Sequence, residues 1–159
     1  MTDFFWQPCL FIYGGTWCIA VVPVMGELPL SIHFIHSVQK TPVVENLVVK
    51  ADGSGFLLIS TKYQSFGVGL PFLESEGVFR KEGDFYIFDH MNRQFPRLSL
   101  RMGVGTELTL CVRGREYRLY ERFAPGTRID LIAVPFYEGA LRVVRQALGD
   151  VLSWKGACP

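Results

Sequence analysis

Residues 30–63 read LSIHFIHSVQKTPVVENLVVKADGSGFLLISTKY. In the first part of this stretch apolar residues alternate with others, so Leu30, Ile32 and Phe34 share one face of an extended chain. Pro42 interrupts the run, because proline cannot donate a hydrogen bond to a neighbouring strand. The DGSG turn at 52–55 separates the two apolar runs that follow. The stretch predicts three consecutive β-strands, over residues 30–38, 43–50 and 56–63.

The rest of the chain repeats this pattern of short apolar runs and glycine-containing turns. Further strands are predicted over residues 9–13, 17–25, 78–81, 85–88, 97–102, 107–112, 115–122 and 128–134. We expect the runs from 97 to 122 to follow one another as a meander. About ten antiparallel strands spaced in this way favour an all-β fold, either a closed β-barrel or a β-sandwich.

The end of the chain changes period. Apolar residues from Tyr137 to Leu152 recur at intervals of three and four, which predicts one amphipathic helix over residues 138–152. We expect its apolar side to cover a face or an end of the β core, since its polar side is too weakly basic for a membrane surface. The chain is therefore expected to form a single domain over residues 1–159, with a β core at 9–134.

Composition excludes several protein classes. Of the 159 residues, 49% are hydrophobic and 19% are charged, which excludes intrinsic disorder. The net charge of +1 provides no overall attraction for nucleic acid or for an anionic membrane. Residues 4–26 carry no charge and are long enough to span a bilayer, but Gly14-Gly15 and two prolines favour a buried β-hairpin. We therefore expect no stable membrane span.

Arginine is concentrated in the second half of the chain, and alternation places several arginines on one side of a strand. A basic sheet face with an aromatic residue is typical of single-strand nucleic-acid binding, but charged residues equally line the solvent face and the edges of ordinary sheets. We favour the second interpretation and expect no nucleic-acid partner. The residues concerned are Arg93, Arg97, Arg101, Arg113, Arg115, Arg118, Arg122 and Arg128.

The residue patterns of metal, nucleotide and hydrolase sites are missing from the sequence. His33 and His36 lie three apart in a predicted strand, so they point to opposite faces and cannot chelate one ion without a bulge. His36 precedes Ser37, which is a pairing that hydrolases use, but neighbouring strand residues diverge and no GxSxG motif is present. No GxGxxG or Walker pattern occurs, and we expect no cofactor and no metal. Four cysteines form no CxxC pair and are expected to be free thiols: Cys9, Cys18, Cys111 and Cys158.

Three segments carry a resemblance to a known family: IHSVQKTPVVE at 35–45, TKYQSFGVGLP at 61–71 and NRQFPRLSLRM at 92–102. Together they resemble a bacterial and archaeal family of small proteins that is described as a domain of unknown function. Its members are often encoded beside TAXI-type TRAP transporters, which use an extracytoplasmic solute-binding protein. The resemblance covers about residues 9–134. It implies no known reaction, and it suggests an accessory or binding role in organic-acid uptake.

Members of that family usually begin with a basic, apolar secretion or anchor segment, whereas only MTDFFWQP precedes the first strand here. The sequence as it stands therefore indicates a cytoplasmic protein, and a leader upstream of this start would make it extracytoplasmic.

The same three segments hold the polar residues that a β-sheet explains least. Each lies at a strand end or in a loop, where rigid scaffolds present functional groups. If they converge, Arg93 can hold a carboxylate with His36 as a second donor, and the glycines let backbone N–H groups approach. The alternative is that these groups only satisfy irregular strand ends. The predicted ligand-binding residues are His36, Ser37, Thr41, Glu45, Gln64, Ser65, Gly67, Gly69, Asn92 and Arg93.

The sequence thus favours a non-enzymatic domain that binds a small organic acid or a TRAP transporter component. A small hydrolase or isomerase with a site assembled from His36, Glu45, Gln64 and Arg93 is the alternative, because such residues can meet in three dimensions. A structural interaction subunit is the third possibility.

Overall fold

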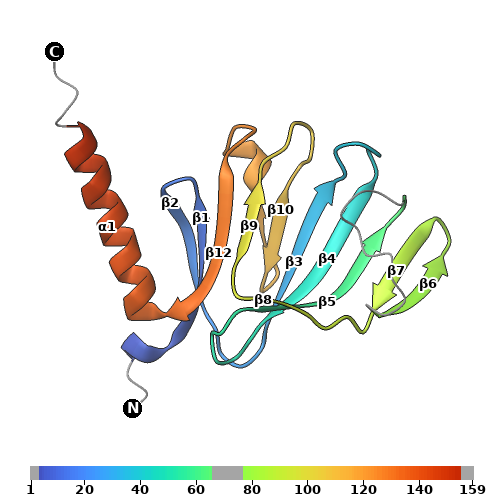
Figure 1. Cartoon of the computed structure of the whole chain (residues 1–159), viewed down its shortest axis with the longest axis horizontal. Helices are drawn as coiled ribbons and strands as arrows, with labels where there is room; N and C mark the ends of the chain where they lie inside the picture. The colour runs from blue at the N-terminus through green and yellow to red at the C-terminus, as the bar shows by residue number, and fades with distance from the viewer. Residues whose placement is uncertain (1–3, 66–76, 155–159) are drawn as a thin grey trace.

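The computed structural model describes residues 4–65 and 77–154, and shows two antiparallel β-sheets followed by a long helix (Figure 1). The chain begins with a 3-10 turn, η1, and a second turn, η3, precedes the last strand. The elements are η1 (Phe4–Trp6), β1 (Pro8–Gly14), β2 (Trp17–Pro23), β3 (Leu28–Ile35), β4 (Pro42–Val49), β5 (Phe56–Tyr63), β6 (Val78–Glu82), β7 (Phe85–Asp89), β8 (Arg93–Phe95), β9 (Leu98–Arg101), β10 (Thr109–Val112), β11 (Arg115–Arg118), η3 (Leu119–Glu121), β12 (Arg128–Pro135) and α1 (Phe136–Trp154).

The strands divide unequally between the two sheets. One sheet has four strands in the order β2-β1-β12-β9. The other has eight, in the order β11-β10-β3-β4-β5-β7-β6, with β8 also paired to β5. The predicted all-β class with one C-terminal helix is confirmed. Of the two architectures expected, the structure has the sandwich-like one, because the sheets remain separate instead of closing into a barrel.

The three strands predicted from residues 30–63 form the centre of the larger sheet. β3 pairs with β4 from Leu28 opposite Val49 to Ile35 opposite Pro42, and β4 pairs with β5 through a register shift after Asn46. The turn before β5 needs glycine at position 55, where φ is +140° and a Cβ atom would lie 2.3 Å from the carbonyl oxygen of Phe95.

The predicted meander over residues 97–122 is wrong. β9 pairs with β12 in the four-stranded sheet, whereas β10 pairs with β3 and β11 in the other sheet, so the chain crosses between sheets at residues 102–108. The hydroxyl of Thr106 donates to the carbonyl oxygen of Gly103 and helps to fix this crossing. The strand predicted over 115–122 also ends early, because the backbone turns into η3 after Arg118.

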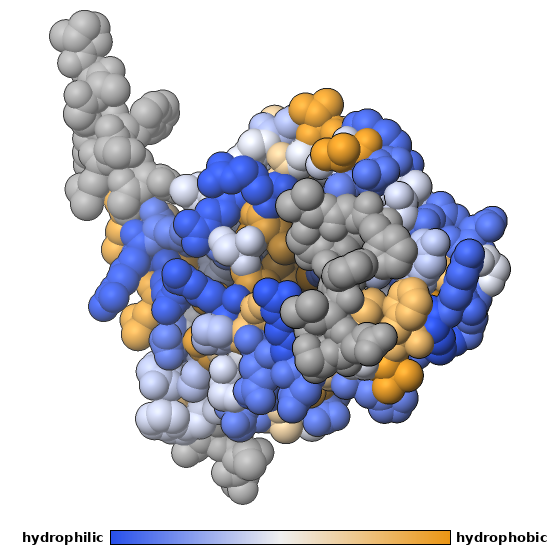
Figure 2. Space-filling view, turned by 45° about the vertical axis from the view of Figure 1, so that its right-hand side comes forward, coloured by the Kyte–Doolittle hydropathy of each residue, from blue (hydrophilic) through white to orange (hydrophobic). Residues whose placement is uncertain are grey.

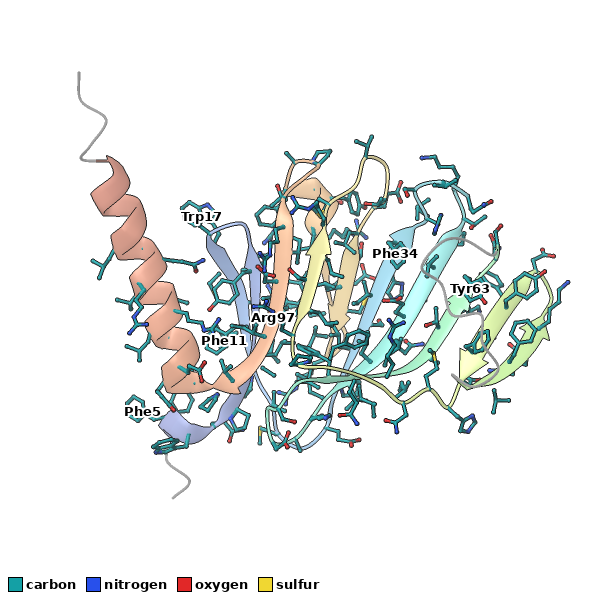
Figure 3. All side chains as sticks on the ribbon, in the orientation of Figure 1. Phe5, Phe11, Trp17, Phe34, Tyr63 and Arg97 are labelled. Atoms are coloured by element: carbon teal, nitrogen blue, oxygen red, sulfur yellow. The ribbon has the colours of Figure 1, made fainter. Side chains whose placement is uncertain are left out.

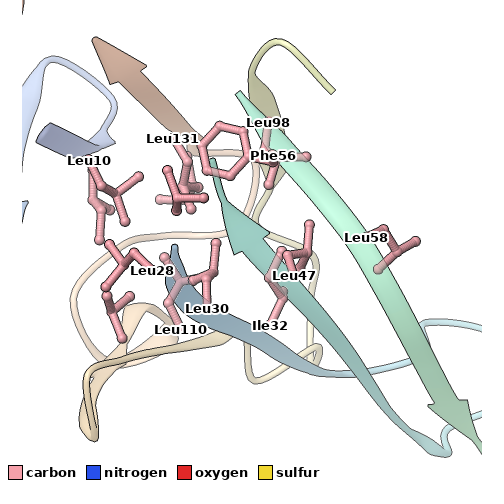
Figure 4. Close-up of a cluster of buried hydrophobic side chains, with 14 of the residues drawn as sticks. Leu10, Leu28, Leu30, Ile32, Leu47, Phe56, Leu58, Leu98, Leu110 and Leu131 are labelled. Carbon is pink, nitrogen blue, oxygen red and sulfur yellow. The ribbon is translucent and has the colours of Figure 1, made fainter. Parts of the chain in front are cut away.

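The main hydrophobic core lies between the sheets (Figure 4). Alternate residues of most strands point into it, as expected for antiparallel sheets that are buried on one face. Strands β3 and β4 contribute Leu28, Leu30, Ile32 and Leu47, and the four-stranded sheet contributes Leu10, Leu98 and Leu131. Each of these residues is at most 8% exposed, so the core accounts for the apolar side of nearly every predicted strand.

Strand β1 is buried on both faces. Leu10 and Ile12 belong to the main core, while Phe11 and Tyr13 form a second cluster on the outer face of the four-stranded sheet. Helix α1 covers that outer face, where Phe11 points from β1 toward the helix (Figure 3). A Cβ atom on Gly139 would lie 2.0 Å from the Phe11 ring, so the absence of a side chain at this position allows the helix to approach β1.

The helix was expected over 138–152 with its apolar side buried, and the second part of this expectation is wrong. The side that meets the sheet includes Phe136, Gly139 and Val143. Four apolar residues on the other side remain between 36% and 57% exposed: Tyr137, Leu141, Val144 and Leu148. The helix is turned this way because Gly139 is the position where the Phe11 ring fits.

Candidate functional site

A cavity of about 340 Å³ lies between strands β3 and β4 of the larger sheet and edge strand β9 of the smaller sheet. We call it the Glu45 cleft. Figure 2 shows a hollow in one face of the molecule with apolar residues exposed near its centre. The described lining of the Glu45 cleft consists of Ile32, Phe34, Ile35, His36, Ser37, Glu45, Leu100, Arg101, Thr106 and Leu108.

Glu45 occupies a position where the sheet would otherwise present an apolar residue. Along β4 it lies on the same face as Val43 and Leu47, which are both buried in the core. Its cross-strand neighbours are Ile32 on β3 and Thr61 on β5, and both side chains are at most 1% exposed. The alternation of the strand therefore directs a carboxyl group toward the space between the sheets.

Burial raises the pKa of the Glu45 carboxyl above its ordinary value of 4.5, and Arg93 opposes this to a smaller extent. Burial has this effect because the ionised carboxylate loses hydration, whereas the protonated form loses little. Glu45 therefore holds its proton at a higher pH than an exposed glutamate does. In that form the carboxyl group can donate a hydrogen bond to a ligand in the cleft.

His36 organises the turn between β3 and β4. Its backbone N–H donates to the carbonyl oxygen of Thr41 (2.9 Å), and its own carbonyl oxygen accepts from the N–H of Lys40 (2.9 Å). Its Nδ1 atom accepts the backbone N–H groups of Val38 (3.3 Å) and Gln39 (3.2 Å). Because Nδ1 is an acceptor, the neutral ring carries its proton on Nε2, which makes Nε2–H the donor that the ring can offer.

Of the ten residues predicted to bind a ligand, the structure brings three together in the Glu45 cleft: His36, Ser37 and Glu45. Arg93 lies on β8, outside the described lining, but close enough for its charge to act on Glu45. Its guanidinium also lies over the ring of Phe95, 5.4 Å from the centroid.

The other predicted residues do not belong to the described lining. The hydroxyl of Thr41 is buried and has no hydrogen-bond partner among the described residues. Ser65 donates to the Oε1 atom of Gln39 (3.2 Å), which ties it to the β3–β4 turn. Gln64 follows β5 and is partly buried, and Asn92 is exposed before β8. Gly67 and Gly69 lie outside the described residues.

One side of the cleft is formed by residues that were not among the predicted ligand-binding residues. Leu100 and Arg101 lie on β9 of the smaller sheet, and Leu108 lies on the crossing that leads to β10. The guanidinium of Arg101 donates to the carbonyl oxygen of Gly126 (3.0 Å), so the residue forms part of the rim while bonded to a loop. No local signal could have found these residues, because the pairing of β9 with β12 and the crossing of the chain between the sheets bring them over β3 and β4.

The described residues were also compared with what a metal site or a membrane-spanning helix requires, and they provide neither. In residues 4–65 and 77–154, no three His, Cys, Asp or Glu side chains are grouped so that they could hold a metal ion. Helix α1, the longest helix of the described chain, is not apolar enough to cross a bilayer, and no other described helix is a candidate.

One comparison with known protein families gives a match that includes the cleft. A family model described as "Domain of unknown function (DUF1850)" matches residues 30–119, which is more than half of the chain. The chain belongs to the DUF1850 family. Every described residue of the Glu45 cleft falls inside the DUF1850 region, whereas β1, β2, β12 and α1 lie outside it. Searches of the curated proteins and of the solved structures returned no match.

Proposed function

We propose that this protein is a binding module that holds a small organic acid in the Glu45 cleft and does not transform it. The observation that carries the proposal is the inward-facing carboxyl of Glu45 among apolar neighbours. An apolar residue at this position would stabilise the sandwich, and natural proteins depart from such local rules mostly at functional sites. A titratable group whose pKa is shifted by burial inside a cleft is also a typical mark of a binding or active site.

The groups that face the cleft suit a ligand with an acceptor end and an apolar body. Protonated Glu45 and the Nε2–H of His36 are both donors, and the nearby positive charge of Arg93 favours an anion. Phe34, Leu100 and Leu108 supply apolar walls. A cavity of about 340 Å³ is at the small end of the range for ligand sites, which favours a short-chain or single-ring acid.

The alternative function is a small hydrolase or isomerase, and the presence of His36 and Glu45 in one cavity is the observation that favours it. A histidine that acts as a general base needs an unprotonated nitrogen facing the substrate. In His36 the unprotonated nitrogen is Nδ1, which already accepts two backbone N–H groups. The hydrogen bonds of the turn therefore favour a donor role in binding over proton abstraction.

The biological setting that we propose is organic-acid uptake by a TRAP-type transporter, with this protein as an accessory component. This part of the proposal rests on the family resemblance of the three sequence segments. Co-purification of a TRAP transporter subunit with the tagged protein would support it. Co-purification without any ligand binding would instead favour a structural interaction subunit.

Thermal-shift measurements test the binding proposal. Succinate, pentanoate and benzoate are the acid probes, and pentylamine is the non-acid probe matched to pentanoate. A ligand at a hundredfold excess over its Kd stabilises a protein by about 2.7 kcal/mol. We expect at least one acid to raise Tm, with a larger shift at pH 5.5 than at pH 8, since protonated Glu45 is the donor.

Variants show whether the shift arises in the cleft. Glu45→Gln keeps a donor and should retain binding while losing its pH dependence, whereas Glu45→Leu should abolish binding. Glu27→Gln is the control, because Glu27 is exposed and distant from the described lining. Stabilisation by the amine alone would contradict the acid class. Turnover in an esterase or phosphatase panel that disappears in His36→Gln would replace the binding role with the enzymatic one.

A further inference from the structure

A second cavity, of about 310 Å³, lies between helix α1 and the outer face of the four-stranded sheet. Figure 1 shows the helix leaning away from this sheet beyond its first turns, which opens the space. We call this cavity the arginine cleft, because its described lining contains four arginines. The lining consists of Tyr13, Gly15, Arg97, Arg128, Asp130, Ile132, Arg142, Arg145 and Gln146.

The arginines come from three separate parts of the chain. On β12, Ile129 and Leu131 face the main core, so Arg128 and Asp130 face outward toward the helix. Arg97 immediately precedes β9, next to this face (Figure 3). Arg142 and Arg145 lie one turn apart on α1 and approach from the opposite wall. Two arginines thus line the cleft on the side of the sheet, and two line it on the side of the helix.

The positive charges of the cleft are only partly compensated. Arg128 donates to Asp130 (2.9 Å) and to the hydroxyl of Ser99 (2.8 Å), and Arg142 pairs with Glu138 (3.4 Å). Among the described residues, Arg97 and Arg145 have neither an ion pair nor a hydrogen bond through their side chains.

Tyr13 adds no negative charge to the cleft. Burial raises the pKa of the Tyr13 hydroxyl to about 12, and this hydroxyl donates to the carbonyl oxygen of Gly139 (3.5 Å). Four guanidinium groups therefore face a single carboxylate, that of Asp130, within the lining.

We propose that the arginine cleft binds a phosphate group. Arginine presents several N–H donors in a planar fork that matches the oxygens of phosphates and carboxylates. Arginines on two opposite walls favour a tetrahedral group, because its oxygens point in several directions, whereas the two oxygens of a carboxylate lie in one plane. A phosphate monoester also carries up to two negative charges, which the two unpaired arginines can neutralise.

The phosphate can belong to a soluble compound or to a lipid headgroup. The exposed apolar side of α1, formed by Tyr137, Leu141, Val144 and Leu148, lies on the same helix as Arg142 and Arg145. A lipid whose headgroup reached the cleft would place its apolar part near such a surface. The experiment therefore includes both forms of phosphate.

The soluble arm measures the binding of inorganic phosphate and glycerol 3-phosphate by calorimetry at low ionic strength, with succinate as the carboxylate comparison. The lipid arm measures co-sedimentation with vesicles that contain phosphatidic acid, whose headgroup is a phosphate monoester. Vesicles of zwitterionic phosphatidylcholine, which carry no net charge, are the comparison. The test variant is Arg97→Gln with Arg145→Gln. The control variant is Arg113→Gln with Arg122→Gln, which removes the same charge from two exposed positions outside the arginine cleft.

We expect the test variant to weaken phosphate binding by at least about tenfold, and the control variant to change it less than about threefold. Binding in the soluble arm identifies a free phosphate compound, and binding in the lipid arm alone identifies a headgroup. The proposal is overturned if neither form binds, if the test variant weakens succinate binding as much as phosphate binding, or if both variants lose phosphate binding equally. Circular dichroism of each variant excludes unfolding as the cause of a loss.

Discussion

Strands β1 and β6 lie toward opposite ends of the molecule and have opposite environments (Figure 1). All seven residues of β1 except the half-buried Pro8 are buried, because the larger sheet covers one face and helix α1 the other. All five residues of β6 are exposed. Burial here depends on which layers cover a strand, since β6 also contains large apolar residues such as Phe79.

The Glu45 cleft lies between these two extremes. It is bordered by β9, the edge strand of the smaller sheet, and by β3 and β4 in the middle of the larger sheet. A carboxyl group is tolerable at such a boundary, because the cleft provides space and partial hydration that the fully covered end does not. We call the end where helix α1 covers β1 the covered end, and the end formed by β6 and β7 the open end. Substitutions at both ends and at the cleft can test this contrast.

The largest effect is expected at the covered end. Phe11 is 1% exposed, so Phe11→Ala should destabilise the protein by about 3–5 kcal/mol through lost burial and a cavity. Phe79→Ala at the open end should cost less than about 2 kcal/mol, because 42% of that side chain is already exposed. Urea unfolding measures both values, and equal losses would contradict the contrast.

A smaller effect is expected where the helix meets β1. Gly139→Ala would place a methyl group against the Phe11 ring, and overpacking of this kind costs about 1–3 kcal/mol. Alanine also favours a helix over glycine by about 1 kcal/mol, which partly offsets this loss. In a Phe11→Leu background the clash is relieved, so the same substitution should become neutral or stabilising. A double-mutant cycle that shows no coupling would disprove the contact.

At the boundary, Glu45→Gln should remove a pH dependence of stability. The pKa of Glu45 is higher in the folded protein than its ordinary value of 4.5, so the folded state binds the proton more tightly. The stability that this proton contributes is fully present below the ordinary value and is lost as the pH rises through the folded pKa. The stability of the glutamine variant relative to the natural chain should therefore rise as the pH increases above the ordinary value of 4.5. Chemical denaturation at pH 4 and pH 7 measures the free energy of unfolding of both proteins. If the difference between the variant and the natural chain is the same at both pH values, Glu45 does not lie in a buried environment.

The smallest effect is expected at the open end. Arg80 on β6 donates to Asp89 on β7 (2.7 Å) and also pairs with Glu82. The side chains of Arg80 and Glu82 are about half exposed, and that of Asp89 is 27% exposed. Exposed ion pairs contribute about 0–1 kcal/mol and are screened by salt. Arg80→Gln should change stability within that range at low salt and by less at high salt. A loss above about 2 kcal/mol would show that the pair is more shielded from water than its exposure indicates.

Local sequence determined much of the fold. The alternation in residues 30–63 and the DGSG turn predicted three strands that the structure contains, and residues 56–63 match β5 at both ends. The change to intervals of three and four predicted the C-terminal helix within two residues of its bounds. These features are readable because side-chain periodicity and turn chemistry act over a few neighbouring residues. The sequence also named Glu45, His36 and Ser37 as candidates, because they are among the polar residues of the resemblance segments that a β-sheet explains least.

Only the tertiary structure decided how the elements combine. It separated β9 from β10 into different sheets, turned an apolar stripe of α1 away from the protein and brought Leu100 and Arg101 over Glu45. It also left Gln64 and Asn92 outside the described lining of the cleft, although their segments looked equally suited to a site. The arginine cleft likewise joins residues 97, 128, 142 and 145, which no local pattern connects. The physical reason is that these outcomes depend on which faces can be buried together, and that is a property of the packed layers and not of any single segment.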